Sequence, residues 1–148
     1  MATKLQVTFD CDDPHRLARF WAEALGYEKE NHVEFVRELL DAGEIPESAT
    51  NVVDGGIQFV DVSTCRRVGV SACRDPEGAG SRLFFQKVPE GKTAKNRVHL
   101  DLHVGADRHE GEAERLEALG AQKLWFSDDR GGPCWTMADV EGNEFCVD

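Results

Sequence analysis

Two histidines and an aspartate alternate with apolar residues in the second half of the chain. His99, Asp101 and His103 lie in the segment VHLDLH. This period of two predicts a strand with its apolar face on a core and its polar face toward water or a ligand. The two histidines are about 13 Å apart along a strand at ~3.3 Å per residue, so one zinc ion cannot easily bind both. Asp101 is nearer, roughly 6.6 Å from His99 along the strand.

A second group of chemically capable residues lies near the end of the sequence. Glu144 and Cys146 are two residues apart in the segment NEFCV, so on a strand they share one face. Cys146 is a soft metal ligand and Glu144 a carboxylate, and with His99 they make a set of at most three metal ligands. Cys146 beside His99 would also make a thiol–imidazole pair, although cysteines in strands are usually unreactive core residues.

A short basic segment contrasts with the acidic remainder of the chain. Lys92, Lys95 and Arg97 lie close together, and they predict either a solvated turn or a rim that captures anionic groups of a ligand. The sequence contains no G-x-G-x-x-G, no P-loop and no G-x-S-x-G motif. The absence of these motifs argues against dinucleotide binding, P-loop phosphate binding and a serine nucleophile.

The composition is that of one acidic globular domain. The chain has 148 residues and a formal net charge of -11, which argues against a nucleic-acid or anionic-membrane surface. No apolar run approaches the ~20 residues that span a bilayer, and residues 1–10 lack a signal-peptide pattern. Without C-x-x-C and with an odd number of cysteines, we expect reduced thiols in a cytoplasmic protein. The cysteines are Cys11, Cys65, Cys73, Cys134 and Cys146.

An internal repeat organises the chain. The tetrapeptide EALG occurs at residues 23–26 and 117–120, and D-x-E-G follows at 75–78 and 139–142. The alternating segment LQVTFD at residues 5–10 matches VHLDLH at 98–103 face for face. Each half therefore predicts a strand, a helix that ends at the glycine of EALG, and several antiparallel strands that include a D-x-E-G turn. The residues expected to face helices are Leu5, Val7, Leu100, Phe145 and Val147.

The first half is longer between its two motifs. Residues 33–42 carry apolar residues at helical spacing and predict an inserted helix, and residues 46–56 predict a loop. We expect this insertion, at about residues 33–60, to cover a binding site as a lid or to contribute to a dimer contact.

With these motifs in this order, the chain resembles the glyoxalase/bleomycin-resistance/dioxygenase superfamily, also called the vicinal-oxygen-chelate superfamily. The segment D-x-D-D-P-x-x-L-A-x-F-W-A-x-A-L-G-Y at residues 10–27 is similar to its first helix. FFQKVPEGK at 84–92, KNRVHLD at 95–101 and D-x-E-G-N-E-F-C-V at 139–147 are similar to its glyoxalase-like branch of mostly bacterial proteins. The resemblance implies an α+β homodimer whose chain, residues 1–148, is a single domain. It also implies two βαβββ modules, at about 1–90 and 93–148, that form a cupped sheet.

The resemblance also implies where a metal would bind. Metal-using members place four ligands in the cup, and these positions fall on Gln6, Gln86, His99 and Cys146. Neutral glutamine oxygens are weak ligands, so we expect no bound cofactor, no tightly held metal and no glyoxalase I activity. If a divalent metal does bind, the expected ligands are His99, Glu144 and Cys146. The expected ligand-binding cup consists of Gln6, Gln86, His99, Asp101, Glu144 and Cys146, with no catalytic residue assigned.

These observations predict a metal-independent cup that binds a small molecule and has no nucleic-acid or membrane partner. The alternative is a metal-dependent lyase, isomerase or dioxygenase of the same superfamily, which the two glutamines disfavour. A third hypothesis is a dimeric interaction or regulatory domain without a small ligand. An open, polar-lined cup favours the first hypothesis over the third.

Overall fold

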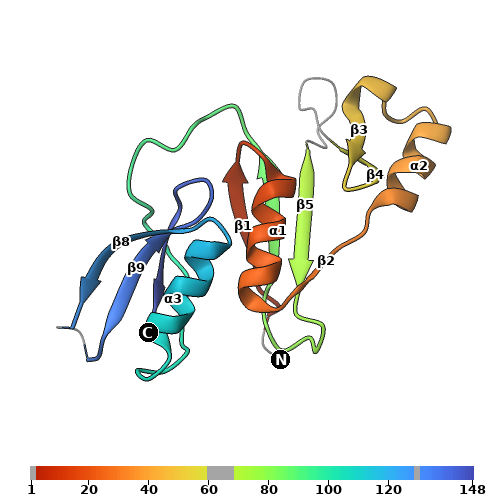
Figure 1. The fold of residues 1–148 in the computed structure, drawn as a ribbon. Helices are drawn as coiled ribbons and strands as arrows, with labels where there is room; N and C mark the ends of the chain where they lie inside the picture. Colours follow the sequence, from red (N-terminus) through yellow and green to blue (C-terminus); the bar gives the residue numbers. More distant parts are fainter. Residues whose placement is uncertain (1–2, 60–68, 129–130) are drawn as a thin grey trace. The chain divides into compact units, whose positions relative to one another are not determined.

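The structure, a computed structural model, describes residues 3–59, 69–128 and 131–148. Cys65 lies outside the described residues. The chain divides into two compact units, Met1–Gly91 and Lys92–Asp148, and Figure 1 shows the strands and helices of each. No helix in the described ranges is long and apolar enough to cross a membrane.

The first unit is built on a four-stranded sheet with the order β1-β6-β5-β2. Strand β1 runs parallel to β6, whereas β5 runs antiparallel to both β6 and β2. This is the order of a βαβββ module, in which the helix connects the first strand to the second. The bounds are β1 (Gln6–Cys11), α1 (Pro14–Leu25), β2 (Glu28–Lys29), β5 (Val70–Arg74) and β6 (Arg82–Lys87).

Helix α1 ends at the glycine of EALG, as the sequence predicted, and a side-chain cap marks its start. The Asp13 side chain accepts hydrogen bonds from the backbone N–H groups of His15 and Arg16, and Pro14 occupies the first turn, where its missing N–H has no cost. Gly26 ends the helix with a φ of 67°, in the left-handed region that glycine tolerates.

The apolar side of α1 covers one face of the first sheet. Leu17 and Trp21 are buried in the helix, and Phe85 is buried on β6. Phe9 on β1 contacts both aromatic rings, with its ring centroid 5.7 Å from that of Trp21 and 5.3 Å from that of Phe85. Trp21 therefore belongs to the core of the first unit. Leu5 is an exception to the predicted pattern: it lies before β1 and is 71% exposed, so it does not pack on a helix.

The insertion contains more regular structure than the sequence predicted. The expected helix is present as α2 (Val33–Asp41). The loop expected at residues 46–56 contains η1 (Glu47–Ala49) and β3 (Thr50–Val53), and β4 (Gly56–Phe59) begins at its last residue. Strands β3 and β4 form an antiparallel hairpin, whose turn residues Asp54 and Gly55 have φ angles of 53° and 78°. Asp-Gly is a preferred pair for such a turn, so the prediction of a loop overlooked a local hairpin signal.

Two kinds of contact hold the insertion within the first unit. The Asp54 carboxylate lies 2.8 Å from Arg19 of α1 and 2.6 Å from Lys29 of β2. Apolar residues of α2 also pack against β4 in a small separate core. This core consists of Val36, Leu39, Ile45 and Phe59, with Leu40, Ile57 and Val70 at its edge.

The second unit repeats the topology of the first. Its sheet has the order β7-β10-β9-β8, with β7 parallel to β10 and β9 antiparallel to both β10 and β8. The two βαβββ modules confirm the predicted fold class. The bounds are β7 (Asp101–Leu102), α3 (His109–Ala118), β8 (Gln122–Ser127), β9 (Cys134–Ala138) and β10 (Glu144–Val147).

The first strand of the second unit is shorter than its sequence pattern predicted. Regular pairing covers two residues of β7 rather than six, and Val98 is 80% exposed. The backbone nevertheless continues beside β10, because the Cys146 N–H donates to the Leu100 carbonyl. This bond keeps the residues that precede β7 next to β10.

The repeated D-x-E-G motif forms a turn in which the aspartate binds backbone N–H groups. Asp75 accepts from the N–H groups of Glu77, Ala79 and Gly80. Asp139 is buried, and it accepts from the N–H groups of Glu141 and Asn143 and from the Asn143 amide. Each of the two turns thus depends on the carboxylate of its own aspartate.

Candidate ligand-binding site in the second unit

One face of the second sheet carries the residues that could bind a ligand or take part in chemistry. Cys146 on β10 is opposite Asp101 on β7 and Thr136 on β9, and Thr136 is opposite Trp125 on β8. These four residues form a row across all four strands. Because side chains alternate along a strand, their sequence neighbours point toward the side of α3. The buried residues on that side include Met137, Phe145 and Val147.

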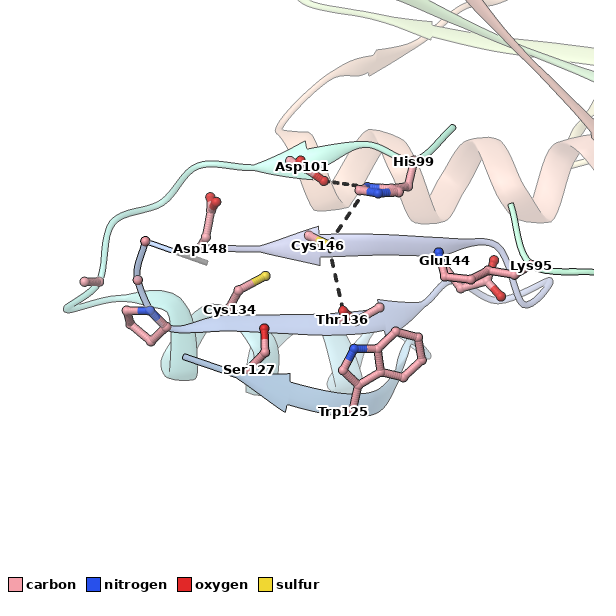
Figure 2. A pocket seen from close by; sticks show the side chains of 14 residues that line it. Lys95, His99, Asp101, Trp125, Ser127, Cys134, Thr136, Glu144, Cys146 and Asp148 are labelled. Atoms are coloured by element: carbon pink, nitrogen blue, oxygen red, sulfur yellow. Dashed lines mark hydrogen bonds and ion pairs between the residues drawn. The ribbon is translucent and has the colours of Figure 1, made fainter. Parts of the chain in front are cut away.

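This face is hollowed into a pocket of about 670 Å³ (Figure 2). A second row, Ser127, Cys134 and Asp148, lies beside the first, and Lys95 and Glu144 line the pocket as well. Ligand pockets in proteins typically have volumes of ~300–1,000 Å³. The pocket therefore has the size to hold a small molecule, and its lining combines polar and apolar surface in similar amounts.

His99, Asp101 and Cys146 converge at one side of the pocket. The His99 Nδ1 lies 2.7 Å from Asp101 Oδ1 and 3.9 Å from Cys146 Sγ, as Figure 2 shows. The candidate metal-binding atoms of these three residues all lie within 4.8 Å of one another. Three of the residues expected in the cup thus meet at one place.

Glu144, the carboxylate predicted as a metal ligand, has other partners. The Lys92 Nζ lies 3.0 Å from Glu144 Oε2, and the Asn96 N–H donates to the same oxygen at 3.0 Å. Burial acts to raise the pKa of Glu144, but the hydrogen bonds from Asn96 and Lys92 outweigh it and lower the pKa. Glu144 thus holds residues 92–96 against β10, and the structure groups Asp101 rather than Glu144 with His99 and Cys146.

The surroundings of Cys146 favour the protonated thiol. Burial and the neighbouring Cys134 raise the pKa of Cys146 to about 12, so the thiol keeps its proton at neutral pH. The His99 ring contacts both Asp101 and Cys146 through the same nitrogen, Nδ1. A catalytic imidazole instead contacts its nucleophile and its orienting carboxylate through different nitrogens, so the geometry does not form a Cys-His-Asp triad.

His103 and the basic segment that contains Lys92, Lys95 and Arg97 make different contacts. His103 Nδ1 lies 2.6 Å from Asp148 Oδ1, but its side chain is 77% exposed. Of the basic residues, Lys95 lines the pocket, whereas Lys92 is bound to Glu144 and to the Ala94 carbonyl. The segment therefore brings one ammonium group to the pocket.

Gln6 and Gln86 belong to the first unit, and they are not adjacent within it. Gln6 is opposite Arg82 in the β1–β6 pair, whereas Gln86 is opposite Asp10. The two glutamines are thus four residues apart along the strands, about 13 Å at ~3.3 Å per residue. Gln6 accepts a hydrogen bond from Arg82, and Gln86 donates one to Asp10 at 2.7 Å. The glutamines share a face of the sheet, but each has its own partner.

More than half of the residues that line the pocket were not predicted from the sequence as site residues. Trp125 and Ser127 lie on β8, and Cys134 and Thr136 lie on β9. The signal that could have identified β9 is the alternation of CWTMA directly before the second D-x-E-G motif. In β8 the alternation is broken by a register shift between Lys123 and Trp125, so its pattern alone did not show which residues share a face.

The fold has close parallels among solved structures. FosX of Listeria monocytogenes, a fosfomycin resistance protein solved as a point mutant with Mn(II) and 1S,2S-dihydroxypropylphosphonic acid, is 11% identical with a TM-score of 0.62, covering 99% of this chain and 90% of that chain. A glyoxalase/bleomycin resistance protein/dioxygenase family enzyme from Burkholderia phytofirmans is 12% identical with a TM-score of 0.60, at 96% and 94% coverage. The hypothetical protein SA1046 from S. aureus is 12% identical with a TM-score of 0.61, at 99% and 93% coverage.

These likenesses show that the chain has the glyoxalase/bleomycin-resistance/dioxygenase fold. Residues 6–147 match the family model described as the glyoxalase-like domain, and the chain belongs to this family. The resemblance inferred from the sequence is confirmed. Among curated proteins, none is significantly similar in sequence.

Proposed function

We propose that the pocket of the second unit binds a small molecule that has a flat apolar part and a polar or anionic group, without a resident metal. The observation that carries the proposal is the pocket of about 670 Å³ itself, which is lined by polar side chains as well as apolar surface. This property distinguishes a binding cup from an interaction domain whose sheet face is filled by its own side chains.

The lining suggests how such a molecule is recognised. Trp125 is 47% exposed, and an aromatic ring on a pocket wall gains contact area when a flat group stacks on it. Lys95 provides a positive charge for an anionic group, while Ser127 and Thr136 provide hydroxyl groups. These groups bind by shape and hydrogen bonding, and none of them needs a metal to orient the ligand.

The proposal is tested by ligand-detected NMR with small aromatic carboxylates and small phosphonates as probes. We expect members of this panel to bind, and we expect Trp125→Ala and Lys95→Ala each to weaken binding roughly tenfold, about 1.4 kcal/mol. Arg97→Ala is the matched control, because Arg97 lies in the same segment but does not line the pocket. Binding that is unchanged in both pocket variants, or a panel without any binder, contradicts the proposal.

A metal-dependent activity is the second candidate function, and the His99, Asp101 and Cys146 group favours it. Nitrogen, oxygen and sulfur donors within 4.8 Å of one another suit a zinc-type ion that keeps an open coordination position. Mn(II), as present in the FosX structure, prefers oxygen-rich sites. A metal held by these three residues would act as a Lewis acid on a ligand oxygen.

Two features of the site nevertheless favour the metal-free function. Asp101 and His99 are already bonded to each other at 2.7 Å, and the raised pKa of Cys146 means that a metal must displace a firmly held proton. Elemental analysis of protein purified without chelator tests this, with an expected content well below one metal ion per chain. Near-stoichiometric metal that is lost in His99→Ala and Asp101→Asn, but retained in Glu144→Gln, contradicts the metal-free proposal.

We also propose that the protein is a cytoplasmic homodimer without nucleic-acid or membrane partners. The net charge of -11 opposes binding to polyanionic surfaces. The four described cysteines, Cys11, Cys73, Cys134 and Cys146, are thiols, which suits a reducing compartment.

A further inference from the structure

Two thiols lie side by side on the pocket face, one on each of two neighbouring strands. Cys146 of β10 is opposite Thr136 of β9, and Cys134 is two residues before Thr136, so the two cysteines are diagonal neighbours on one face. Both line the pocket, and the neighbouring Cys134 contributes to the raised pKa of Cys146. In Figure 2 the side chain of Cys134 rises from β9 toward β10.

The other described cysteines are placed differently. Cys11 and Cys73 are buried at 4% and 0% exposure, and neither lines the pocket. Cys134 and Cys146, by contrast, are only partly buried and border an open space of about 670 Å³. A small reagent that enters the pocket can therefore reach this pair.

We propose that Cys134 and Cys146 are a redox-active pair that forms a reversible disulfide across β9 and β10, with a small-molecule disulfide as the oxidant. In the first step the Cys134 sulfur, as thiolate, attacks one sulfur of the oxidant, which breaks the S–S bond and releases one thiolate. In the second step the Cys146 sulfur loses its proton to solvent and attacks the Cys134 sulfur, which releases the second thiolate. The protein is oxidised by two electrons, and the oxidant is reduced to two thiols.

The order of the two steps follows from the position of each residue. Cys134 is the first residue of β9 and follows Gly131, Gly132 and Pro133 at the edge of the pocket, whereas Cys146 lies within β10 between two paired strands. A reagent from solvent meets the residue at the strand end first. Cys146 then reacts with a partner that the fold already holds beside it, at a high effective concentration.

Closing the bond requires a small movement of one strand end. Diagonal neighbours in an antiparallel pair are ~7–8 Å apart, slightly more than the ~4.4–6.8 Å between the Cα atoms of a disulfide. Gly131 has a φ of 101°, and a side chain at Gly132 would meet open space, so the segment before Cys134 has room to adjust. A disulfide that needs such adjustment is more easily reduced than an unstrained one, which fits a reversible bond.

The disulfide would also change the pocket. It removes the Cys146 sulfur from the group that contains His99 and Asp101, and it pulls the start of β9 toward β10. This consequence for ligand binding rests on the proposed function, whereas formation of the bond does not.

The experiment equilibrates the native, reduced protein with mixtures of oxidised and reduced glutathione, followed by acid quenching, alkylation and mass mapping. Glu141 and Glu144 separate the two cysteines in the sequence, so cleavage at glutamate places them in different peptides and reveals a link between them. We expect both thiols to be lost together, with one transition, and a Cys134–Cys146 link that reduced glutathione reverses. In Cys146→Ser we expect a stable mixed disulfide on Cys134. In Cys134→Ser we expect a roughly tenfold slower loss of the Cys146 thiol, because Cys146 lies within β10 between two paired strands rather than at a strand end.

Three results overturn the proposal: no thiol loss, a mixed disulfide that persists in the wild-type protein, or a link of either residue to another cysteine. A Cys65→Ser control tests the last of these, since the Cys134–Cys146 link must form in it unchanged. Ligand binding is measured separately on reduced protein, so failure of the proposed function and failure of the disulfide are distinguishable.

Discussion

At the scale of single residues, the pairing of each carboxylate decides what it can do. Asp101 is bonded to His99 inside the pocket, whereas Glu144 is bonded to Lys92 and to the Asn96 backbone. The two carboxylates lie on neighbouring strands of one sheet face and both line the pocket, yet Asp101 pairs with His99 whereas Glu144 holds a segment of chain against β10. In the first unit, Glu30 has a structural role like that of Glu144, because it pairs with Arg82 of β6.

The Glu30–Arg82 pair predicts a pH-dependent stability. Arg82 Nε and Nη2 each donate to a Glu30 carboxylate oxygen at 2.7 Å. The hydrogen bonds from Arg82 lower the pKa of Glu30 against the opposing effect of burial. A lowered folded-state pKa means that the contribution is fully present above the unfolded pKa of about 4.3 and is lost as pH falls through the folded value.

We therefore expect Glu30→Gln to lower the free energy of unfolding by roughly 1–2 kcal/mol at pH 7, after allowance for the partial exposure of the pair. The deficit should shrink below pH 4, where the wild-type carboxylate also becomes protonated. Urea unfolding followed by circular dichroism at several pH values measures both quantities, with the exposed Arg37→Gln as control. A deficit that is constant from pH 7 to pH 3 would show that the pair does not act through its charge.

At the scale of elements, the repeated D-x-E-G motif shows how one residue shapes a turn. Asp139 is buried, and its carboxylate accepts hydrogen bonds from the backbone between β9 and β10. This turn sets the register of the β9–β10 pair, and the register places Thr136 opposite Cys146. The arrangement of the pocket face therefore depends on a residue outside the pocket.

We expect Asp139→Ala to destabilise the protein by roughly 1–3 kcal/mol, because it leaves backbone N–H groups at a buried turn without their acceptor. Amide hydrogen exchange should also increase for Glu141 and Asn143, whose N–H groups lose their partner. The exposed Glu114→Ala in α3 is the control, with an expected change within about 0.5 kcal/mol. Unchanged exchange at Glu141 and Asn143 would argue against this role for Asp139.

At the scale of the whole molecule, the chain is two units of one topology, Met1–Gly91 and Lys92–Asp148. They differ in what they carry. The first unit contains the insertion with α2 and the β3–β4 hairpin, and the second contains the pocket with His99, Asp101 and Cys146. The same backbone plan thus supports a structural extension in one unit and a candidate binding face in the other.

The assembly prediction belongs to this scale. We expect a homodimer, and light scattering after size exclusion should give twice the chain mass of 16.5 kDa across micromolar concentrations. The net charge does not prevent association, because physiological salt screens exposed charges beyond ~8–10 Å. A mass of one chain over the whole concentration range would contradict the prediction.

The sequence by itself determined the fold, because each repeated motif specifies its own helix end or turn through short segments of chain. The matching order of EALG and D-x-E-G predicted two modules, and Gly26, the glycine of the first EALG, marked the end of a helix. The Asp54-Gly55 hairpin was equally readable from local signals, although a loop was predicted there. Alternation also predicted that His99, Asp101, Glu144 and Cys146 lie on polar strand faces.

Only the tertiary structure decided which of these residues work together. Lys92 and the Asn96 N–H bind the Glu144 carboxylate, although both are about 50 residues away in the sequence. Asp101 rather than Glu144 therefore lies with His99 and Cys146. The parallel pairing of β7 with β10 and the shifted register of β8 place Trp125, Cys134 and Thr136 in the pocket. Strand alternation specifies the face of a residue but not its neighbour across the sheet, because that neighbour is set by pairing between strands that are distant in sequence.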